Sequence, residues 1–234
     1  MERALPALKI WPEATLSNGE ALVLHFENAD ETPIQSARFL LDRLKPAAGG
    51  GLTRTGPVAI PGYPIALAQD GSLVSIEPAP GQTGAGLLHR VQLAATDATV
   101  LATQPVDAHF GTAAVVGDRI ITLREPGDVC ELELTLESRP LALDGSPPQT
   151  LRFPRFDYEP IVMAGIGYGI VAVAPDGIVL GNSESRTFLR VSVDAGGALS
   201  LSGFASAPCY IGHLQWQGDV IFGSCQGRDV TLAL

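Results

Sequence analysis

Acidic side chains are the residues of this sequence with the clearest chemical potential, because hydrolysis of a glycosidic bond needs two carboxylates beside that bond. Several of them stand between apolar segments, where loops are expected. These candidates are Glu27, Asp107, Glu125, Asp157, Glu159 and Glu184. Convergence of three or more of them in one pocket would indicate a hydrolase. A bound Ca²⁺ would suit such a set of oxygen ligands.

The segment 153–160 mixes charged and aromatic side chains, among them Asp157, Tyr158 and Glu159. We interpret it as an insertion, because the spacing between repeated turns is longest here. Insertions on a rigid scaffold often carry ligand contacts. A solvated surface loop is the alternative interpretation.

Histidines and cysteines are too scattered to predict a metal centre. His109 and His213 could converge only with help from carboxylates, so we expect hydrogen-bonded histidines and no cofactor, with Ca²⁺ as the alternative. Cys209 and Cys225 flank the Gln217-Gly218 turn. They form either a disulfide or, as we favour, two buried thiols. The Gly-x-Ser-x-Gly motif of serine hydrolases does not occur in the sequence.

The composition of the chain argues against nucleic acid and membranes as binding partners. The chain has 234 residues with 15 basic and 25 acidic side chains, a net charge of −10, and 46% hydrophobic residues. Its acidity disfavours nucleic acid, and its apolar stretches are too short for membrane insertion. The first residues lack the apolar run of a secretion signal. We therefore expect a cytoplasmic protein, or a secreted or virion-associated one if the chain is processed or part of an assembly.

The elements that must position these residues are β-hairpins. Glycine-containing turn dipeptides recur roughly 40 to 60 residues apart, and each precedes a short apolar run. These dipeptides are Asn18-Gly19, Asp70-Gly71, Gly117-Asp118, Asp176-Gly177 and Gly218-Asp219. We expect φ above zero at Gly71 and Gly177, so that Gly177→Val would cost about 1 kcal/mol or more.

A third strand follows each hairpin, and a fourth often follows the third. The third strands are expected at 41–45, 88–93, 129–134, 188–193 and 229–234, and the fourth strands at 51–55, 99–102, 140–143 and 198–201. Residues 33–45 also fit an amphipathic helix with Thr32 as N-cap. The match between Leu41-Asp42-Arg43-Leu44 and Leu88-His89-Arg90-Val91 favours a strand there.

The recurring Leu-x-Arg-Val-x-Leu after an Asp-Gly hairpin resembles the blade motif of bacterial lactonase-like and quinoprotein-like β-propellers. The resemblance covers nearly the whole chain. It implies one all-β domain over 1–234, with about five four-stranded antiparallel blades. Five-bladed rings as a class include lectins and glycosidases, but a shared fold is a weak guide to function.

Closure of such a ring needs a fourth strand in the last blade, whose third strand ends at Leu234. We expect residues 4–10 to supply it, so that deletion of residues 1–11 would expose a sheet edge and cause aggregation.

Two functions are compatible with this sequence. The leading interpretation is a non-catalytic binding or assembly module that presents a loop-lined face to a protein or carbohydrate partner, in an undetermined oligomeric state. The alternative is a hydrolase of the lactonase or glycosidase type. The predicted working face contains residues 27–37, 56–62, 77–86, 103–109, 124–128, 152–160, 181–187, 203–209 and 223–227. From this face we select as contact residues Asp107, His109, Glu125, Asp157, Tyr158, Glu159 and Arg186.

Overall fold

The fold is described from a computed structural model of the chain, and the part of the chain that it describes is built from β-strands and turns. It describes residues 9–15, 19–27, 38–78, 85–107, 110–124, 133–154, 169–182, 187–207, 212–217, 220–225 and 228–233. Among these residues no helix is long and apolar enough to span a membrane. The chain divides into two compact units, residues 1–108 with 142–144 and residues 109–141 with 145–234.

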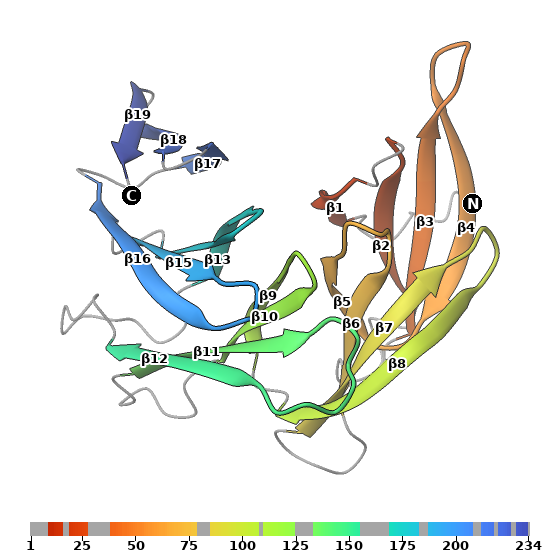
Figure 1. The fold of residues 1–234 in the computed structure, drawn as a ribbon. Coiled ribbons are helices and arrows are strands. Elements are labelled where there is room, and N and C mark those ends of the chain that lie inside the picture. The colour runs from red at the N-terminus through yellow and green to blue at the C-terminus, as the bar shows by residue number, and fades with distance from the viewer. Residues whose placement is uncertain are drawn as a thin grey trace. The chain divides into compact units, whose positions relative to one another are not determined.

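The first unit contains two antiparallel sheets of four strands, each in chain order (Figure 1). The first sheet consists of β1 (Lys9–Thr15), β2 (Ala21–Glu27), β3 (Arg38–Pro46) and β4 (Leu52–Ile60). The second consists of β5 (Tyr63–Leu67), β6 (Leu73–Pro78), β7 (Ala85–Leu93) and β8 (Ala98–Asp107).

The second unit contains three antiparallel sheets (Figure 1). The third sheet consists of β9 (Phe110–Val116), β10 (Arg119–Arg124), β11 (Glu133–Pro140) and β12 (Gln149–Pro154). The fourth consists of β13 (Gly169–Ala174), β14 (Gly177–Asn182), β15 (Thr187–Val193) and β16 (Leu199–Ser206). The fifth consists of β17 (Gly212–Gln217), β18 (Val220–Cys225) and β19 (Arg228–Ala233).

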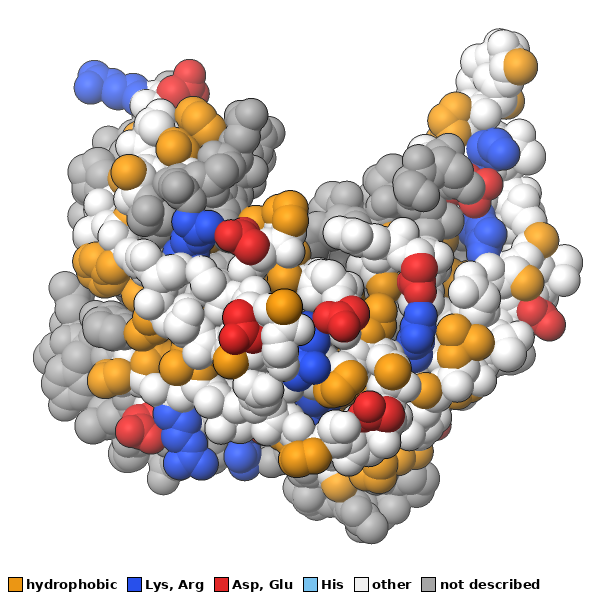
Figure 2. All heavy atoms as spheres, viewed as in Figure 1, with side chains coloured by type: hydrophobic (Ala, Val, Ile, Leu, Met, Phe, Trp, Pro, Cys, Tyr) orange, Lys and Arg blue, Asp and Glu red, His pale blue; other side chains and the backbone are white. Residues whose placement is uncertain are grey.

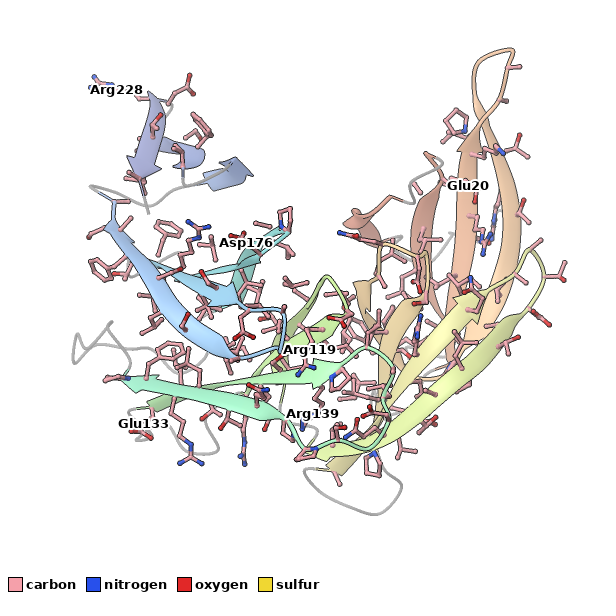
Figure 3. All side chains as sticks on the ribbon, viewed as in Figure 1. Glu20, Arg119, Glu133, Arg139, Asp176 and Arg228 are labelled. Atoms are coloured by element: carbon pink, nitrogen blue, oxygen red, sulfur yellow. The ribbon has the colours of Figure 1, made fainter. Side chains whose placement is uncertain are left out.

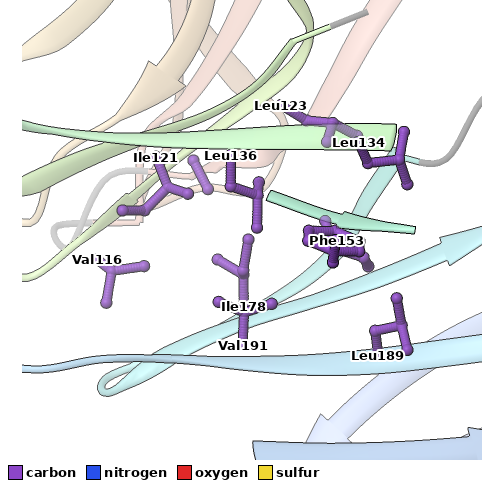
Figure 4. Packing of buried hydrophobic residues seen from close by; sticks show 11 residues of the cluster. Val116, Ile121, Leu123, Leu134, Leu136, Phe153, Ile178, Leu189 and Val191 are labelled. Atoms are coloured by element: carbon purple, nitrogen blue, oxygen red, sulfur yellow. The ribbon is translucent and has the colours of Figure 1, made fainter. Parts of the chain in front are cut away.

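Each unit has its own hydrophobic core between consecutive sheets. In the first unit, Leu22 and Leu41 of the first sheet share a buried cluster with Leu73 and Val91 of the second. In the second unit, the third and fourth sheets contribute to one cluster (Figure 4), in which Ile121, Leu136 and Ile178 are fully buried. Burial of such side chains contributes about 1.5–3 kcal/mol each. This apolar packing is what holds the sheets face to face.

The outer strands carry most of the large hydrophobic side chains that remain exposed. Leu52 lies on β4, Val100 and Leu101 lie on β8, and Leu201 and Phe204 lie on β16. On the face drawn in Figure 2, hydrophobic side chains form small separate groups among polar ones. Scattered exposure of this kind is ordinary for a globular protein.

The predicted strands are confirmed in most units. The segment with two interpretations, 33–45, is a strand from Arg38 to Pro46, while residues 28–37 lie outside the described part. The third sheet differs from prediction, because its third strand runs from Glu133 to Pro140 and its fourth from Gln149 to Pro154. The predicted insertion therefore begins later than 153, since Phe153 is a core residue of β12.

The two predicted positive-φ glycines behave differently. Gly71 has φ +79° and donates its N–H to the carbonyl of Ala68 at 2.9 Å, as the left-handed residue after a tight turn does. Gly177 does not have a positive φ, so that prediction is wrong. The loop between β13 and β14 is Pro175-Asp176, since Ala174 pairs with Gly177. Proline is favoured as the second residue of a type I turn, which places the turn one residue earlier than expected.

The recurring arginine of the third strand has a structural role. In three sheets it pairs with an acidic residue close to the turn between the first and second strands. The pairs are Arg43 with Glu20 at 3.7 Å, Arg90 with Asp70 at 2.5 Å and Arg190 with Asp176 at 3.0 Å between N and O atoms. Figure 3 labels Glu20 and Asp176. In these three sheets the arginine thus links the third strand to the first hairpin of its own sheet.

Only the end of the predicted closing segment, residues 4–10, lies in the described part of the chain. Lys9 and Ile10 pair with Leu24 and Val23 of β2, so they belong to the first sheet. Residues 1–8 lie outside the described part. In the fifth sheet, β19 is the last of the three described strands.

Candidate functional site

Three neighbouring strands of the second sheet bring together a carboxylate, an imidazole and a hydroxyl. Glu77 lies near the end of β6, His89 in the middle of β7 and Thr103 in β8. His89 is the cross-strand partner of Thr103 on one side and of Ser75 on the other. Because side chains alternate across a strand, Glu77 shares the face of Ser75 and hence of His89. We call Glu77, His89 and Thr103 the relay.

The contacts within the relay are short and run through both nitrogens of one ring. Thr103 Oγ1 lies 2.9 Å from His89 Nδ1, and Glu77 Oε2 lies 3.2 Å from His89 Nε2. The imidazole is buried, with 6% of the residue exposed, whereas the Glu77 side chain is 48% exposed and Thr103 is exposed. An exposed threonine therefore places its hydroxyl against a buried imidazole.

The hydrogen-bond partner of each ring nitrogen determines which tautomer of His89 the relay requires. A carboxylate accepts hydrogen bonds only, so it favours the proton on Nε2. Nδ1 is then an acceptor and receives the hydrogen bond of the Thr103 hydroxyl. Acid, base and hydroxyl in this order form the arrangement that activates a nucleophile in acyl transfer.

A second buried polar group lies on β11 in the other unit. Glu137 and Arg139 are two residues apart on one face of the strand, with Oε2 and Nη2 separated by 2.7 Å (Figure 3 labels Arg139). Burial lowers the pKa of the Arg139 guanidinium, and the charge of Glu137 opposes this shift. The pair explains how β11 can bury Glu137 and Arg139 within a strand of polar sequence.

The predicted contact residues are mostly beyond what the structure describes. His109, Glu125, Asp157, Tyr158, Glu159 and Arg186 lie outside the described residues, and for Asp107 only the backbone, at the end of β8, is described. The carboxylate convergence expected around these residues therefore stays a prediction. Two relay residues, Glu77 and Thr103, do fall within the predicted working-face segments 77–86 and 103–109.

Sequence reasoning missed the relay itself. Its one signal was His89, a polar residue at a position of β7 that alternation assigns to the same face as the buried Val91. Histidines were expected to be hydrogen-bonded, and both ring nitrogens of His89 are. Within the described part of the chain, no cluster of three or more metal-ligating side chains is found.

Comparison with known proteins yields structural similarity alone. No protein family and no curated protein matches the sequence. A protein from Bacteroides fragilis described as a "putative 6-phosphogluconolactonase" superposes with a TM-score of 0.54 at 14% identity, covering 91% of this chain and 67% of that one. A Lactobacillus plantarum protein gives 0.49 at 14% identity, covering 98% and 82%. BamB from Moraxella catarrhalis gives 0.43 at 10% identity, covering 95% and 59%.

These comparisons support an all-β fold of the β-propeller type, and the argument for it rests on the Bacteroides fragilis protein. They contradict the leading interpretation of the sequence, the non-catalytic binding or assembly module, and favour its alternative, a hydrolase.

Proposed function

We propose that this protein is a hydrolase that opens lactones. The observation that carries the proposal is the relay, in which one imidazole bridges a carboxylate at 3.2 Å and the hydroxyl of an exposed threonine at 2.9 Å. The likeness in fold to the Bacteroides fragilis protein supports the same reaction class. The relay supplies one carboxylate and one imidazole, which suits attack on an acyl carbon better than the paired carboxylates of glycoside hydrolysis.

The chemistry requires His89 to accept and then return one proton. Nδ1 takes the proton from the oxygen that attacks the lactone carbonyl, and the charge of Glu77 stabilises the imidazolium that forms. The ring C–O bond then breaks, and His89 returns the proton to the leaving oxygen. Net addition of one water molecule gives the hydroxy acid.

Hydrolysis of a panel of sugar lactones and simple γ- and δ-lactones by the purified chain tests the proposal, with acid release followed at constant pH. We expect His89→Gln to reduce kcat/KM by about 100-fold or more, because general-base catalysis contributes that much. Gln92→Ala, at an exposed position of β7, is the control and should leave the rate unchanged. A wild-type rate equal to the buffer blank, or full activity in His89→Gln, would refute the proposal.

The loop residues selected from the sequence enter this proposal as substrate contacts. They are Asp107, His109, Glu125, Asp157, Tyr158, Glu159 and Arg186. Joint replacement of Asp157, Tyr158 and Glu159 by Ala should raise KM without lowering the melting temperature by more than about 4 °C. A Ca²⁺ requirement would show as loss of activity and stability in EDTA.

For the fold we propose a five-bladed ring closed by the N-terminus. The supporting facts are five sheets in the described residues and a fifth sheet with three described strands. Because residues 9–11 belong to β1 or lead into it, deletion of residues 1–8 is a cleaner test than deletion of 1–11. We expect this deletion to expose the edge of β19 and promote aggregation. A monomeric, equally stable deletion variant would exclude closure by this segment.

A further inference from the structure

We infer that the Thr103 hydroxyl is itself the nucleophile, so that catalysis passes through an acyl-enzyme on β8. The inference rests on the proposed function and identifies the attacking atom, which could otherwise be a water molecule. An imidazole has two nitrogens, and His89 uses both: Nε2 meets Glu77 and Nδ1 meets Thr103. A water molecule could reach the base only by displacing one of these partners.

The solvent exposure of the residues around His89 also favours the Thr103 oxygen as the nucleophile. A substrate in solvent can reach Thr103, which is exposed on the last strand of its sheet, but not the imidazole behind it. The other hydroxyl beside His89 belongs to Ser75, which is fully buried and donates to the carbonyl of Pro61. Ser75 is therefore committed to the backbone, whereas the Thr103 hydroxyl is directed at the base.

The reaction balances with water as the only co-substrate. Thr103 Oγ1 attacks the lactone carbonyl carbon and its proton moves to His89 Nδ1. The ring C–O bond breaks, and the ring oxygen takes that proton to become a hydroxyl that stays attached through the opened chain. Water then attacks the ester carbonyl, transfers a proton by way of Nδ1 to Thr103 Oγ1, and releases the hydroxy acid.

Acylation by a lactone increases the mass of the enzyme by a characteristic amount. No fragment departs when the ring opens, so the acyl-enzyme is heavier than the free chain by the full mass of the lactone. A strained β-lactone is a suitable probe, because its ring opening is strongly favourable. The full-length protein is incubated with this probe, quenched in acid, digested and analysed by mass spectrometry.

We expect one full-mass adduct on the peptide that contains Thr103, formed in the wild type and in Thr103→Ser. Thr103→Val keeps the shape of the side chain but removes the hydroxyl, and His89→Gln removes the base. Both should lose labelling by about 100-fold or more. Thr99→Val, at another exposed threonine of β8, is the matched control and should label like the wild type.

The outcomes separate this inference from the proposed function. Lactone hydrolysis that survives in Thr103→Val but not in His89→Gln would overturn the nucleophile and keep the hydrolase. Labelling elsewhere in the chain, or equal labelling of Thr103→Val, would also overturn it. A wild type that hydrolyses no lactone yet labels at Thr103 in a His89-dependent way would support the nucleophile and refute lactone turnover as the proposed function. Circular dichroism of every variant shows that the fold is retained.

Discussion

Replacing Gly177 by Ala should destabilise the second unit through a steric clash between two paired strands. A Cβ built on Gly177 would lie 2.2 Å from the carbonyl oxygen of Val191 and 3.2 Å from the Cα of Ser192. Both atoms belong to the backbone of β15, which pairs with β14 throughout its length. Because φ at Gly177 is not positive, the backbone conformation itself is acceptable for alanine.

The clash can be relieved only if β14 and β15 move apart around Gly177. Overpacking of this kind costs about 1–3 kcal/mol. Weakening one ladder hydrogen bond adds about 1 kcal/mol. We therefore expect Gly177→Ala to lower the free energy of unfolding by about 2–4 kcal/mol.

Gly145 in the same unit provides the matched control. Its φ is +83°, and a Cβ there would meet nothing within 4 Å. Gly145→Ala should cost about 1–2 kcal/mol, from backbone conformation alone. Asparagine tolerates the left-handed region, so Gly145→Asn should recover part of that loss, whereas Gly177→Asn should recover nothing.

Urea denaturation followed by far-UV circular dichroism measures all four variants. If Gly177→Ala is no more destabilising than Gly145→Ala, a clash between the added Cβ and the Val191 carbonyl is refuted as the cause. Recovery by asparagine at Gly177 would likewise refute the reasoning, because it would mean that a backbone angle and not a clash requires glycine there.

Three further predictions concern charged groups. The Ser72 hydroxyl, which donates to Asp70 Oδ1 at 2.6 Å, is the main reason that the pKa of Asp70 is lowered, and the Arg90 charge adds to it against partial burial. Asp70→Asn should therefore reduce stability at neutral pH, and its difference from the wild type should begin to shrink in acid denaturation as the pH falls below about 4 and disappear only below the lowered pKa of folded Asp70. Arg139→Met should cost about 3–5 kcal/mol in urea denaturation because it leaves the Glu137 carboxylate buried without its cation, and adding Glu137→Leu should restore part of the loss. Glu77→Gln should lower kcat for lactone opening by about 100-fold with little change in KM, since it removes the charge that stabilises the imidazolium; an unchanged kcat would exclude Glu77 from the relay.

The hairpins could be predicted from the sequence because turn chemistry and alternation act locally. Gly71 and the strands on either side of it follow directly from an Asp-Gly dipeptide between apolar runs. The turn before Gly177 was placed one residue late, because Pro175 determines the conformation of its own position and shifts the loop. What glycine provides at 177 is the absence of a Cβ beside the carbonyl oxygen of Val191, and no local sequence pattern predicts that requirement.

The third sheet shows where alternation fails. The predicted strand at 129–134 follows an apolar run, but the strand in the structure is Glu133–Pro140, which buries Glu137, Ser138 and Arg139. These side chains are tolerated because Glu137 and Arg139 neutralise each other at 2.7 Å. Hydrophobic alternation cannot predict that two charged side chains are buried because their opposite charges neutralise each other.

The relay could not be predicted for a related reason. Its members are separated by 12 and 14 positions along the chain, and only the antiparallel register of β6, β7 and β8 places them side by side. A shift of one residue in β7 would turn His89 to the opposite face and leave Arg90 beside Thr103. The register also determines how far each group meets solvent: the Glu77 side chain is about half exposed, whereas the His89 imidazole is buried. In the proposed mechanism the imidazolium forms beside the Glu77 carboxylate, whose opposite charge offsets the cost of a buried cation, and this is the physical reason for proposing the chemistry at these three residues.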